Sequence, residues 1–422
     1  MTSTSRDEVY RRFDVSAAPR PTYAVWELTL ACDQTCLHCG SRAGTARPGE
    51  LSTEQALSVA AQLGAMGCFE CALIGGEAYL HPGFLDIIRA LRRAGVRPSL
   101  TSGGRGITAE LAQQMAEAGL HTVSISVDGL EATHDLMRAA RGSCASALRA
   151  LSHLRDAGIR TSSNINLNRL NEADLEPLLE VLHSLGISGW QVQITAPLGR
   201  AADRAAMLLQ PWDLLPLLPR IARLKVRAWN EHRIVLQPGN NLGYFGPEEA
   251  LLRSPQPDMK DHFQGCQAGR QLLGIESNGA VKGCPSLQSS HYVGGNVLEK
   301  PLAELWATAP ELAITRNRTV DDLWGFCRSC VFAETCMAGC TFTAHAILGR
   351  PGNNPYCHYR ARTQAARGLR ERLVPVEAAP GQPFDNGRFE LVEEPNDAPD
   401  PRPPTPRQLV RKTRLLTTLS SL

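Results

Sequence analysis

The sequence has almost no net charge and no long apolar segment. Its 44 lysines and arginines nearly balance 42 aspartates and glutamates, so the formal charge of the 422-residue chain is +2. A nucleic-acid-binding protein neutralises phosphates with a broad basic surface, which this composition does not offer. No apolar run approaches the roughly 18–20 residues that cross a bilayer, and Met1–Arg20 lacks the apolar core of a signal peptide. We therefore expect a cytoplasmic protein with neither nucleic acid nor membrane as a partner.

Cysteine, by contrast, is abundant, with 13 residues in the chain. In a secreted protein this count would indicate disulfides, but in a cytoplasmic protein metal or cluster ligation is the better interpretation. The distribution is uneven, since three cysteines lie between residues 32 and 39 and seven between residues 266 and 357. The three others, which we interpret as buried structural thiols, are Cys68, Cys71 and Cys144.

Between residues 23 and 195 the sequence repeats one unit, a β-prone apolar run followed by a polar loop and an amphipathic helical pattern. The expected strands are Tyr23–Thr29, Cys71–Ile74, Arg97–Ser102, Thr122–Val127, Arg160–Leu167 and Trp190–Thr195. The expected helices are Thr53–Met66, Phe84–Ala94, Thr108–Ala118, Cys144–Ala157 and Ala173–Leu185. Each helix precedes a glycine suited to a left-handed turn, namely Gly67, Gly95, Gly119, Gly158 or Gly186. The N-caps expected are Ser52, Thr108 and Asn171.

Such alternation predicts an α/β fold with a parallel sheet and helices on its outside. Six units are too few for a closed eight-stranded barrel, so we expect a partial (β/α)6 TIM-like barrel over residues 21–202, after an N-terminal extension over residues 1–20. In that architecture the chemistry lies in the loops that follow the carboxyl ends of the strands.

The remaining sequence divides into three segments. Residues 203–262 indicate a helical bridge, and residues 263–360 form a small cysteine-rich α+β domain. Residues 361–422 are expected to contain a helix end and a Pro-rich tail, largely disordered from about Leu373 onward. Within that tail, Arg407–Leu422 fits either a solvated segment or a short basic amphipathic helix.

The first cysteine group, Cys32-x3-Cys36-x2-Cys39, directly follows the first expected strand. Three thiolates can hold three irons of a four-iron cluster and leave the fourth iron open for a cofactor or substrate. The alternative is a three-cysteine zinc knuckle. This spacing, with His38 just before the last cysteine, resembles the signature of the radical SAM superfamily.

That resemblance implies a [4Fe–4S] cluster whose open iron chelates the amino and carboxylate groups of S-adenosylmethionine (SAM). One electron then cleaves SAM to a 5′-deoxyadenosyl radical, which abstracts hydrogen from the substrate. Gly75-Gly76-Glu77 follows the second expected strand, where family members contact the methionyl amino group of SAM. Most members have proline next, and here Ala78 replaces it.

Four more polar residues near strand ends match positions that contact SAM in the family. Ser126 and Arg138 are expected to hold the SAM carboxylate, and an arginine fork suits that group chemically. Ser102 ends the third strand, and Asn164 on the fifth strand is a further candidate. For each residue, an ordinary hydrogen-bonded role at a strand end is the alternative.

The second cysteine group resembles the SPASM domain, which carries up to two auxiliary [4Fe–4S] clusters in radical SAM enzymes. By that resemblance one cluster is held by Cys327, Cys330, Cys336 and Cys357, and the other by Cys266, Cys284 and Cys340. The second set is one ligand short, so either Asp261 or His262 completes it or its iron is open to substrate. A zinc ribbon on the same thiolates is the alternative.

Enzymes with this domain pair most often modify ribosomally made peptides by cross-linking, thioether formation, epimerisation or oxidation. We therefore expect a peptide substrate, a separate leader-binding protein, since no such domain is fused, and a reductant such as flavodoxin or ferredoxin. Oxidation of a tetrapyrrole or another small molecule is the second hypothesis. A non-catalytic iron–sulfur electron carrier or zinc scaffold is the third. No catalytic acid or base is assigned, although Asp128 and Glu276 are loop candidates.

Overall fold

One nine-stranded sheet organises the computed structural model, which describes residues 18–404. The strand order is β7-β6-β5-β4-β3-β2-β1-β8-β9, and neighbouring strands are parallel except in the β8–β9 hairpin. The strands are β1 Tyr23–Glu27, β2 Glu70–Ile74, β3 Arg97–Ser102, β4 Thr122–Ser126, β5 Arg160–Leu167, β6 Gly189–Ile194, β7 Val235–Pro238, β8 Leu272–Ile275 and β9 Val281–Lys282. All six expected strands form within two residues of their predicted ends, and the expected partial barrel is confirmed.

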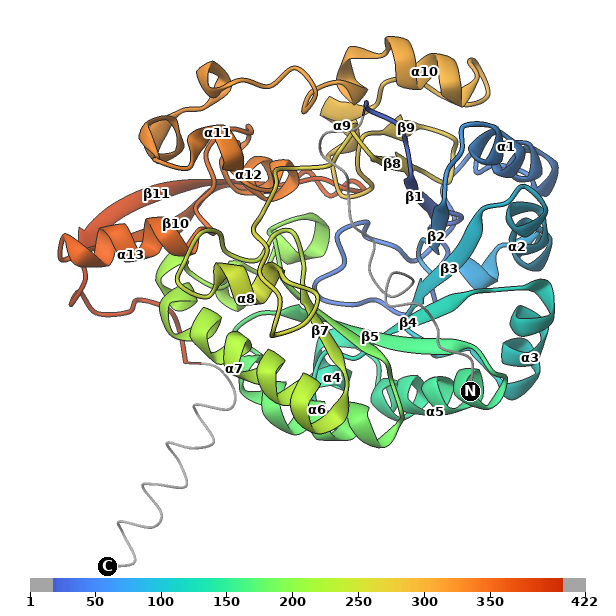
Figure 1. Cartoon of the computed structure of the whole chain (residues 1–422), viewed down its shortest axis with the longest axis horizontal. Coiled ribbons are helices and arrows are strands. Elements are labelled where there is room, and N and C mark those ends of the chain that lie inside the picture. Colours follow the sequence, from blue (N-terminus) through green and yellow to red (C-terminus); the bar gives the residue numbers. More distant parts are fainter. Residues whose placement is uncertain (1–17, 405–422) are drawn as a thin grey trace, which may run out of the picture.

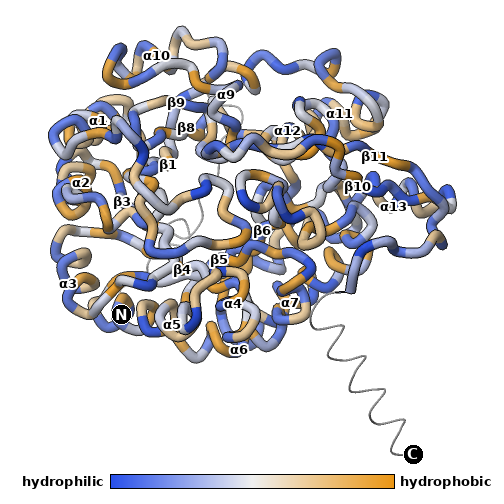
Figure 2. The backbone as a smooth tube through the Cα atoms, turned by 180° about the vertical axis from the view of Figure 1, so that it is seen from behind, coloured by the Kyte–Doolittle hydropathy of each residue, from blue (hydrophilic) through white to orange (hydrophobic). Residues whose placement is uncertain are grey.

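Helices cover the outside of the curved sheet, as Figures 1 and 2 show from opposite sides. They are α1 Thr53–Ala65, α2 Phe84–Arg93, α3 Ala109–Ala118, α4 Glu131–Arg138, α5 Ser143–Asp156 and α6 Leu175–Ser184. The five predicted glycines all have φ between 71° and 90°, as the left-handed turn after a helix requires. Ser52 and Thr108 cap α1 and α3 as predicted. Asn171 makes no capping bond, because its side chain accepts from Asn168 N and donates to Asp128 O.

The strands alternate apolar and polar side chains, and the apolar ones face the helices. Ala24 and Trp26 of β1, for example, belong to the main hydrophobic core, as do Val123 and Ile125 of β4. Because successive side chains point to opposite faces of a strand, the residues between them face the interior of the barrel. The interior is therefore polar, unlike the packed interior of a closed TIM barrel.

The chain after the barrel lies across one side of it in Figure 1. Helix α7 (Leu214–His232) packs beside α6, and β7 and α8 (Glu249–Arg253) follow. The cysteine-rich part contains the β8–β9 hairpin and several short helices, α9 Ser289–Tyr292, α10 Leu302–Thr308, α11 Ala333–Cys336 and α12 Thr341–Leu348. Helix α13 (His358–Ala366) ends it.

A C-terminal hairpin occupies the first part of the tail expected to be disordered after Leu373. Strands β10 (Leu369–Glu377) and β11 (Arg388–Pro395) pair antiparallel, so the prediction of a disordered tail is wrong for this segment. Leu373 and Phe389 are buried in the main core, and these two long-range contacts stabilise strands whose composition is otherwise polar. The segment Arg407–Leu422 lies outside the described residues.

The loop of this hairpin reaches the first cysteine group. Phe384 N donates to Gly40 O, Arg42 Nε forms a 2.8 Å ion pair with Asp385 Oδ1, and Gly199 N donates to Asp385 O. The hairpin is thereby attached to two loops at the mouth of the barrel. Within residues 18–404, none of the helices has the length and apolar character needed to span a bilayer.

Candidate active site

A polar cavity of about 310 Å³ lies at the carboxyl ends of strands β1 to β6. The barrel contributes the ends of these strands and the loops after them, including the first cysteine group. Residues from the later parts of the chain form the opposite side, namely Asn241, Ser286, Phe342 and Phe384. The cavity is therefore enclosed jointly by the barrel, the cysteine-rich part and the C-terminal hairpin.

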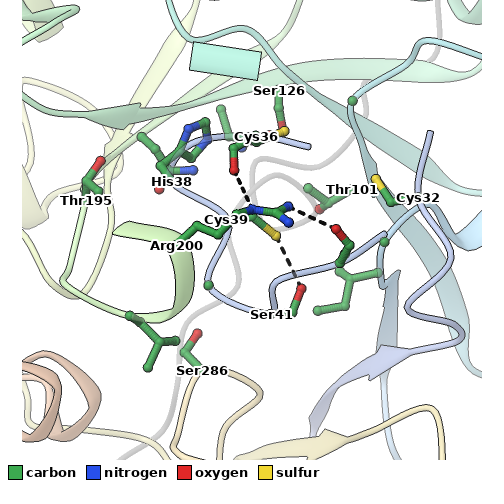
Figure 3. Close-up of a pocket in the computed structure, with 18 of the residues that line it drawn as sticks. Cys32, Cys36, His38, Cys39, Ser41, Thr101, Ser126, Thr195, Arg200 and Ser286 are labelled. Carbon is green, nitrogen blue, oxygen red and sulfur yellow. Dashed lines mark hydrogen bonds between the residues drawn. The ribbon is translucent and has the colours of Figure 1, made fainter. Parts of the chain in front are cut away.

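The loop that carries Cys32, Cys36 and Cys39 is held in place by backbone contacts and by Arg200. Cys32 N donates to Gly44 O over 2.9 Å, which closes the base of the loop. The Arg200 guanidinium donates from Nε to Cys36 O (2.8 Å) and from Nη2 to Ala43 O (2.9 Å). Figure 3 shows Arg200 among Cys36, Cys39 and Ser41 of the cysteine loop, with Cys32 and Thr195 on opposite sides. All three thiols line the cavity.

The thiols of this loop are poorly solvated. Burial raises the pKa of Cys32 to about 12, and burial also raises the pKa of Cys36, although the Arg138 guanidinium opposes that shift. Arg138 Nη1 lies 3.7 Å from Cys36 Sγ. A thiolate is the metal-binding form of cysteine, so a cation bound to these thiols would supply the charge compensation that the buried site lacks.

The Gly75-Gly76-Glu77 turn packs directly on the backbone that leads into the cysteine loop. A Cβ on Gly76 would lie 2.1 Å from Ala31 O, and one on Gly75 would lie 2.3 Å from Thr29 O, so neither position has room for a side chain. Two hydrogen bonds also join this turn to the backbone before the cysteine loop, from Gly76 N to Thr29 O and from Glu77 N to Ala31 O. The absence of side chains thus fixes Glu77 beside the first cysteine.

Glu77 is a buried carboxylate whose two oxygens are both engaged. Ser102 Oγ donates to its Oε2 (2.6 Å) and Gly103 N donates to its Oε1 (2.7 Å). Burial raises the pKa of Glu77 to about 7, and the two hydrogen bonds limit that rise. One oxygen of Glu77 lies within 4.8 Å of Cys32 Sγ and of an Asp33 oxygen.

Arg138, at the end of α4, forms a buried ion pair with Asp128. Arg138 Nη2 lies 2.7 Å from Asp128 Oδ2, and His38 Nε2 lies 3.3 Å from the same oxygen. Burial alone would raise the pKa of Asp128, but Arg138 and His38 together hold it well below its usual range. Arg138 thus carries a fixed positive charge at the cavity wall, beside Cys36.

Ser126 and Asn164 meet across strands β4 and β5. Asn164 Nδ2 donates to Ser126 Oγ (3.0 Å), and Ser124 Oγ donates to Asn164 Oδ1 (3.1 Å). The register pairs Ser126 with Asn164, which brings both side chains to the same point of the wall. They offer a hydroxyl and an amide to whatever occupies the cavity.

All seven residues predicted to contact SAM and all three cysteines of the first group line this one cavity. The loop candidates for acid–base chemistry do not line it. Asp128 forms an ion pair with Arg138 and accepts from Asn166 N, and Glu276 is paired with Arg47 and Lys282, so the structure places neither candidate at the cavity wall. The sequence analysis also missed cavity residues, among them Glu27, Gln34, Asn166, Gln193 and Arg200. The period-two alternation within the strands could have indicated Glu27, Asn166 and Gln193.

The second cysteine group contains a closed set of four thiols. Cys327, Cys330, Cys336 and Cys357 line a cavity of only about 20 Å³, walled by aromatic side chains. Phe245 stacks on Phe332 with ring centroids 4.4 Å apart, and Tyr359 meets Phe332 edge-on. Burial raises the pKa of Cys357 to about 12. These four thiols match the predicted four-ligand set.

The other three thiols of the second cysteine group are Cys266, Cys284 and Cys340. Cys266 and Cys284 pack against the same small hydrophobic cluster, and burial raises the pKa of Cys284 to about 12, with the charges of Cys340 and Cys266 adding to that rise. Neither candidate fourth ligand is directed to them by a described contact. Asp261 Oδ1 accepts from His262 N and Gln264 Nε2, while the exposed His262 ring faces Phe245.

Comparison with known proteins identifies these two cysteine-bearing parts. Residues 26–182 match the model of the radical SAM superfamily, and residues 266–331 match the SPASM iron–sulfur cluster-binding domain. The chain belongs to the radical SAM superfamily. Its first domain implies SAM and a [4Fe–4S] cluster, and its SPASM domain implies auxiliary iron–sulfur clusters. As a radical SAM/SPASM enzyme it combines the cavity and the closed cysteine group in one chain.

Relatives with different names cover most of the chain. An AdoMet-dependent heme synthase of Methanosarcina barkeri is 28% identical over 350 residues, 81% of this chain and 97% of the relative. Mycofactocin maturase MftC of Mycobacterium tuberculosis is 29% identical over 380 residues, 89% of this chain and 90% of the relative. The fold is also that of Streptococcus suis SuiB bound to precursor peptide SuiA, with a TM-score of 0.62, 15% identity and coverage of 81% of this chain and 76% of SuiB.

The residues present fit the implied cofactors. Besides three convergent thiols, the cavity wall contains buried polar atoms without a protein partner, including Gln34 Nε2 and Arg138 Nε. Buried polar groups are normally satisfied, so such atoms at a cavity wall are expected where a polar ligand binds. We propose that Cys32, Cys36 and Cys39 hold the cluster and that the seven predicted wall residues, Gly75 and Gly76 among them, contact SAM.

Proposed function

We propose that this radical SAM/SPASM enzyme modifies a ribosomally made peptide by abstracting hydrogen from it. The observation that carries the proposal is the character of the cavity wall. Beyond the cysteines and glycines, hydroxyls and carboxamides are the largest polar class there, in 11 of 23 lining residues, such as Thr101, Asn166, Gln193, Thr195 and Asn241. Neutral donors and acceptors of this kind complement a peptide backbone, which presents one donor and one acceptor at most residues.

Both arginines of the described cavity wall have protein partners, and the Nε of Arg138, which has none, is assigned here to the SAM carboxylate. Arg200 binds two backbone carbonyls, and Arg138 is paired with Asp128. The acidic wall residues Glu27 and Glu77 would repel a substrate that carries several carboxylates. A tetrapyrrole with propionate groups therefore finds less complementarity in this wall than a neutral peptide segment does.

Two solved structures of the same fold support a peptide substrate by analogy. SuiB was solved with its precursor peptide SuiA, and anSMEcpe was solved with AdoMet and the Cp18Cys peptide. The relative named mycofactocin maturase MftC also supports a peptide substrate. We further propose that flavodoxin or ferredoxin supplies the electron and that a separate protein binds the peptide leader.

Tetrapyrrole chemistry is the second candidate. The observation in its favour is that relatives named AdoMet-dependent heme synthase and pre-heme d1 synthase cover 81–83% of this chain, at 26–28% identity. These relatives match the barrel and the cysteine-rich part together, as the maturase does. The cavity wall favours the peptide over this candidate.

The chain's own residues would prepare the reaction as follows. When bound at these residues, SAM and the cluster would supply the radical chemistry that removes a hydrogen atom from the substrate. Glu77, fixed by Ser102 and Gly103 N, offers its oxygens to an ammonium group, and Arg138 offers a guanidinium to a carboxylate. Phe342 and Phe384 cover the cavity from the far side and limit the access of water.

Mass spectrometry tests the proposal. A candidate precursor peptide, chosen from short reading frames near the gene, is co-expressed anaerobically with this chain, and its mass is compared with that from a Cys32→Ala, Cys36→Ala, Cys39→Ala variant. We expect a loss of about two hydrogens per modified site with the wild-type chain only, as cross-linking by hydrogen abstraction requires. An unchanged mass with deuterium taken up from heavy water would instead identify epimerisation.

The tetrapyrrole alternative predicts a different result in the same experiment. The peptide would be recovered unmodified, although the enzyme still releases 5′-deoxyadenosine when it is reduced in the presence of SAM. A coproporphyrin would then be converted under the same conditions. That combination of results would overturn the peptide proposal.

A further inference from the structure

Glu27 is a buried carboxylate at the end of strand β1 that has no assigned role. Its neighbours Trp26 and Leu28 belong to the main core, so the alternation of the strand turns Glu27 toward the barrel interior. It lines the polar cavity, and only 2% of its surface is exposed. A buried acid in such a position requires a partner for each of its oxygens.

Only one oxygen of Glu27 has such a partner. Oε1 accepts from Arg47 Nη2 (2.9 Å) and from Ser277 N (3.1 Å), whereas Oε2 is buried without a hydrogen-bond partner. Glu77, the other carboxylate of the wall, has both oxygens engaged by protein groups. Glu27 therefore retains an acceptor that the chain does not use.

A buried charge network holds Glu27 rigidly in its position. Arg47 also contacts Glu276 Oε2 at 2.7 Å, and Lys282 Nζ contacts Glu276 Oε1 at 2.7 Å. Lys282 in turn lies 4.0 Å from the ring centroid of Phe384, which lines the same cavity. Burial raises the pKa of Glu27 and Glu276 adds to the rise, while Arg47 opposes it.

We propose that Glu27 is a substrate-binding residue whose Oε2 accepts a hydrogen bond from a backbone amide N–H of the peptide. The inference rests on the proposed peptide-modifying function. A buried oxygen without a hydrogen-bond donor has lost its contact with water at a cost in free energy. A substrate amide that donates to Oε2 offsets that cost and also forms a charge-assisted hydrogen bond. Asn166 and Gln193, on strands β5 and β6 of the same cavity, offer carboxamides to other groups of that backbone.

The first test measures peptide affinity. The candidate precursor peptide is labelled with fluorescein, and its binding to the cluster-loaded enzyme with SAM is followed anaerobically by fluorescence anisotropy. We expect Glu27→Gln to weaken binding by about tenfold or more, the range of a hydrogen bond to a charged group. Glu276→Gln is the matched control, because it disturbs the same Arg47 network from outside the cavity. It should retain the wild-type affinity within about twofold.

Equal losses in both variants would overturn the inference, because Glu27 would then act only through the network. Wild-type affinity of Glu27→Gln for a peptide that the enzyme still modifies would also overturn it, and the proposed function would stand. If the wild-type enzyme neither binds nor modifies the peptide, the proposed function is wrong and this inference is wrong with it.

A second test leaves the protein unchanged, so it does not depend on the folding of a variant. Each backbone amide of the peptide is N-methylated in turn, and the affinity of the wild-type enzyme is measured for each. One position should lose about tenfold or more in affinity, because a methylated amide cannot donate to Glu27. A scan in which no position loses affinity would overturn the inference.

Discussion

The two cysteine groups of the molecule are built in opposite ways. Around the first, three thiols line a polar cavity of about 310 Å³ and are surrounded by hydroxyls, carboxamides and fixed charges. Around the four thiols Cys327, Cys330, Cys336 and Cys357, aromatic rings leave about 20 Å³. Cysteine sulfur atoms therefore occur in two different environments, one beside a cavity with polar groups and one enclosed by aromatic rings, and these suit different functions.

The difference follows from the number of ligands and from solvation. Three thiols leave a coordination position open, and a cofactor can reach that position only through a cavity that also satisfies its polar groups. Four thiols complete the coordination, so an apolar wall can close around them. We infer that chemistry on a substrate takes place at the first group and that the second group handles electrons or supports the fold.

Removing the open group should have the largest effect. In the Cys32→Ala, Cys36→Ala, Cys39→Ala variant we expect release of 5′-deoxyadenosine to fall to the level measured without enzyme. The iron content should fall by about four of roughly twelve irons per chain. Chromatography of the nucleoside and iron analysis measure both quantities. Substantial SAM cleavage in this variant would show that the two groups do not divide the tasks as proposed.

Breaking the closed group should affect the product and leave SAM cleavage nearly intact. Cys327→Ala with Cys330→Ala should again remove about four irons and abolish the peptide product. Release of 5′-deoxyadenosine should stay within about threefold of the wild-type rate, under 1 kcal/mol in activation free energy. Circular dichroism controls for folding. If a folded variant lost SAM cleavage as completely as the first, the comparison between the groups would fail.

The fixed charges of the open site can be tested through stability. Arg138→Gln removes the partner of Asp128, a fully buried carboxylate, and should lower the free energy of unfolding of the metal-free chain by about 3–5 kcal/mol. Adding Asp128→Asn should recover most of the lost free energy of unfolding, because it removes the buried carboxylate charge that no longer has a partner. Urea denaturation measures both. A double variant no more stable than the single one would contradict the assignment of the ion pair.

The pH dependence of stability should reveal Glu77. Burial raises the pKa of Glu77 to about 7 from its ordinary 4.5. The folded chain therefore binds this proton more tightly than the unfolded chain, and the free energy of unfolding falls as pH rises from about 4.5 to 7, by up to about 3 kcal/mol. Glu77→Gln should lack this component. Urea denaturation of the metal-free chain at pH 5.5 and pH 8 provides the comparison. Identical pH dependence in both proteins would contradict it.

The sequence was informative where local signals determine the structure. Apolar alternation and the glycines after each helix gave strands β1 to β6 within two residues, but not β7 and β8 of the same sheet, and cysteine spacing separated the two groups. Contacts between distant residues could not be predicted in this way. Arg200 binds Cys36 O, 164 positions away, and the C-terminal hairpin depends on burying Leu373 and Phe389 in the main core. The amino-acid composition of a segment does not record its contacts with distant residues. For this reason the polar, Pro-rich composition after Leu373 indicated disorder.

The Glu27 site shows the same limit at a single residue. Alternation along β1 indicates that Glu27 faces the interior, but it does not indicate that one of its oxygens lacks a partner. That fact depends on Arg47, in the cysteine loop, and on Ser277, after β8. Three segments must come together before the unused acceptor can be recognised.

The smallest effect concerns one hydroxyl of the open site. Ser126 and Ser124 lie on the same strand and both bond Asn164, but only Ser126 lines the cavity with the cysteines. If Ser126 contacts SAM, Ser126→Ala should lower the affinity for SAM by about 1 kcal/mol, roughly fivefold. Ser124→Ala should leave it unchanged, since Ser124 faces the opposite end of the barrel. Equilibrium binding of SAM to the cluster-loaded enzyme measures both. Equal losses would show that Asn164, rather than the serine itself, carries the effect.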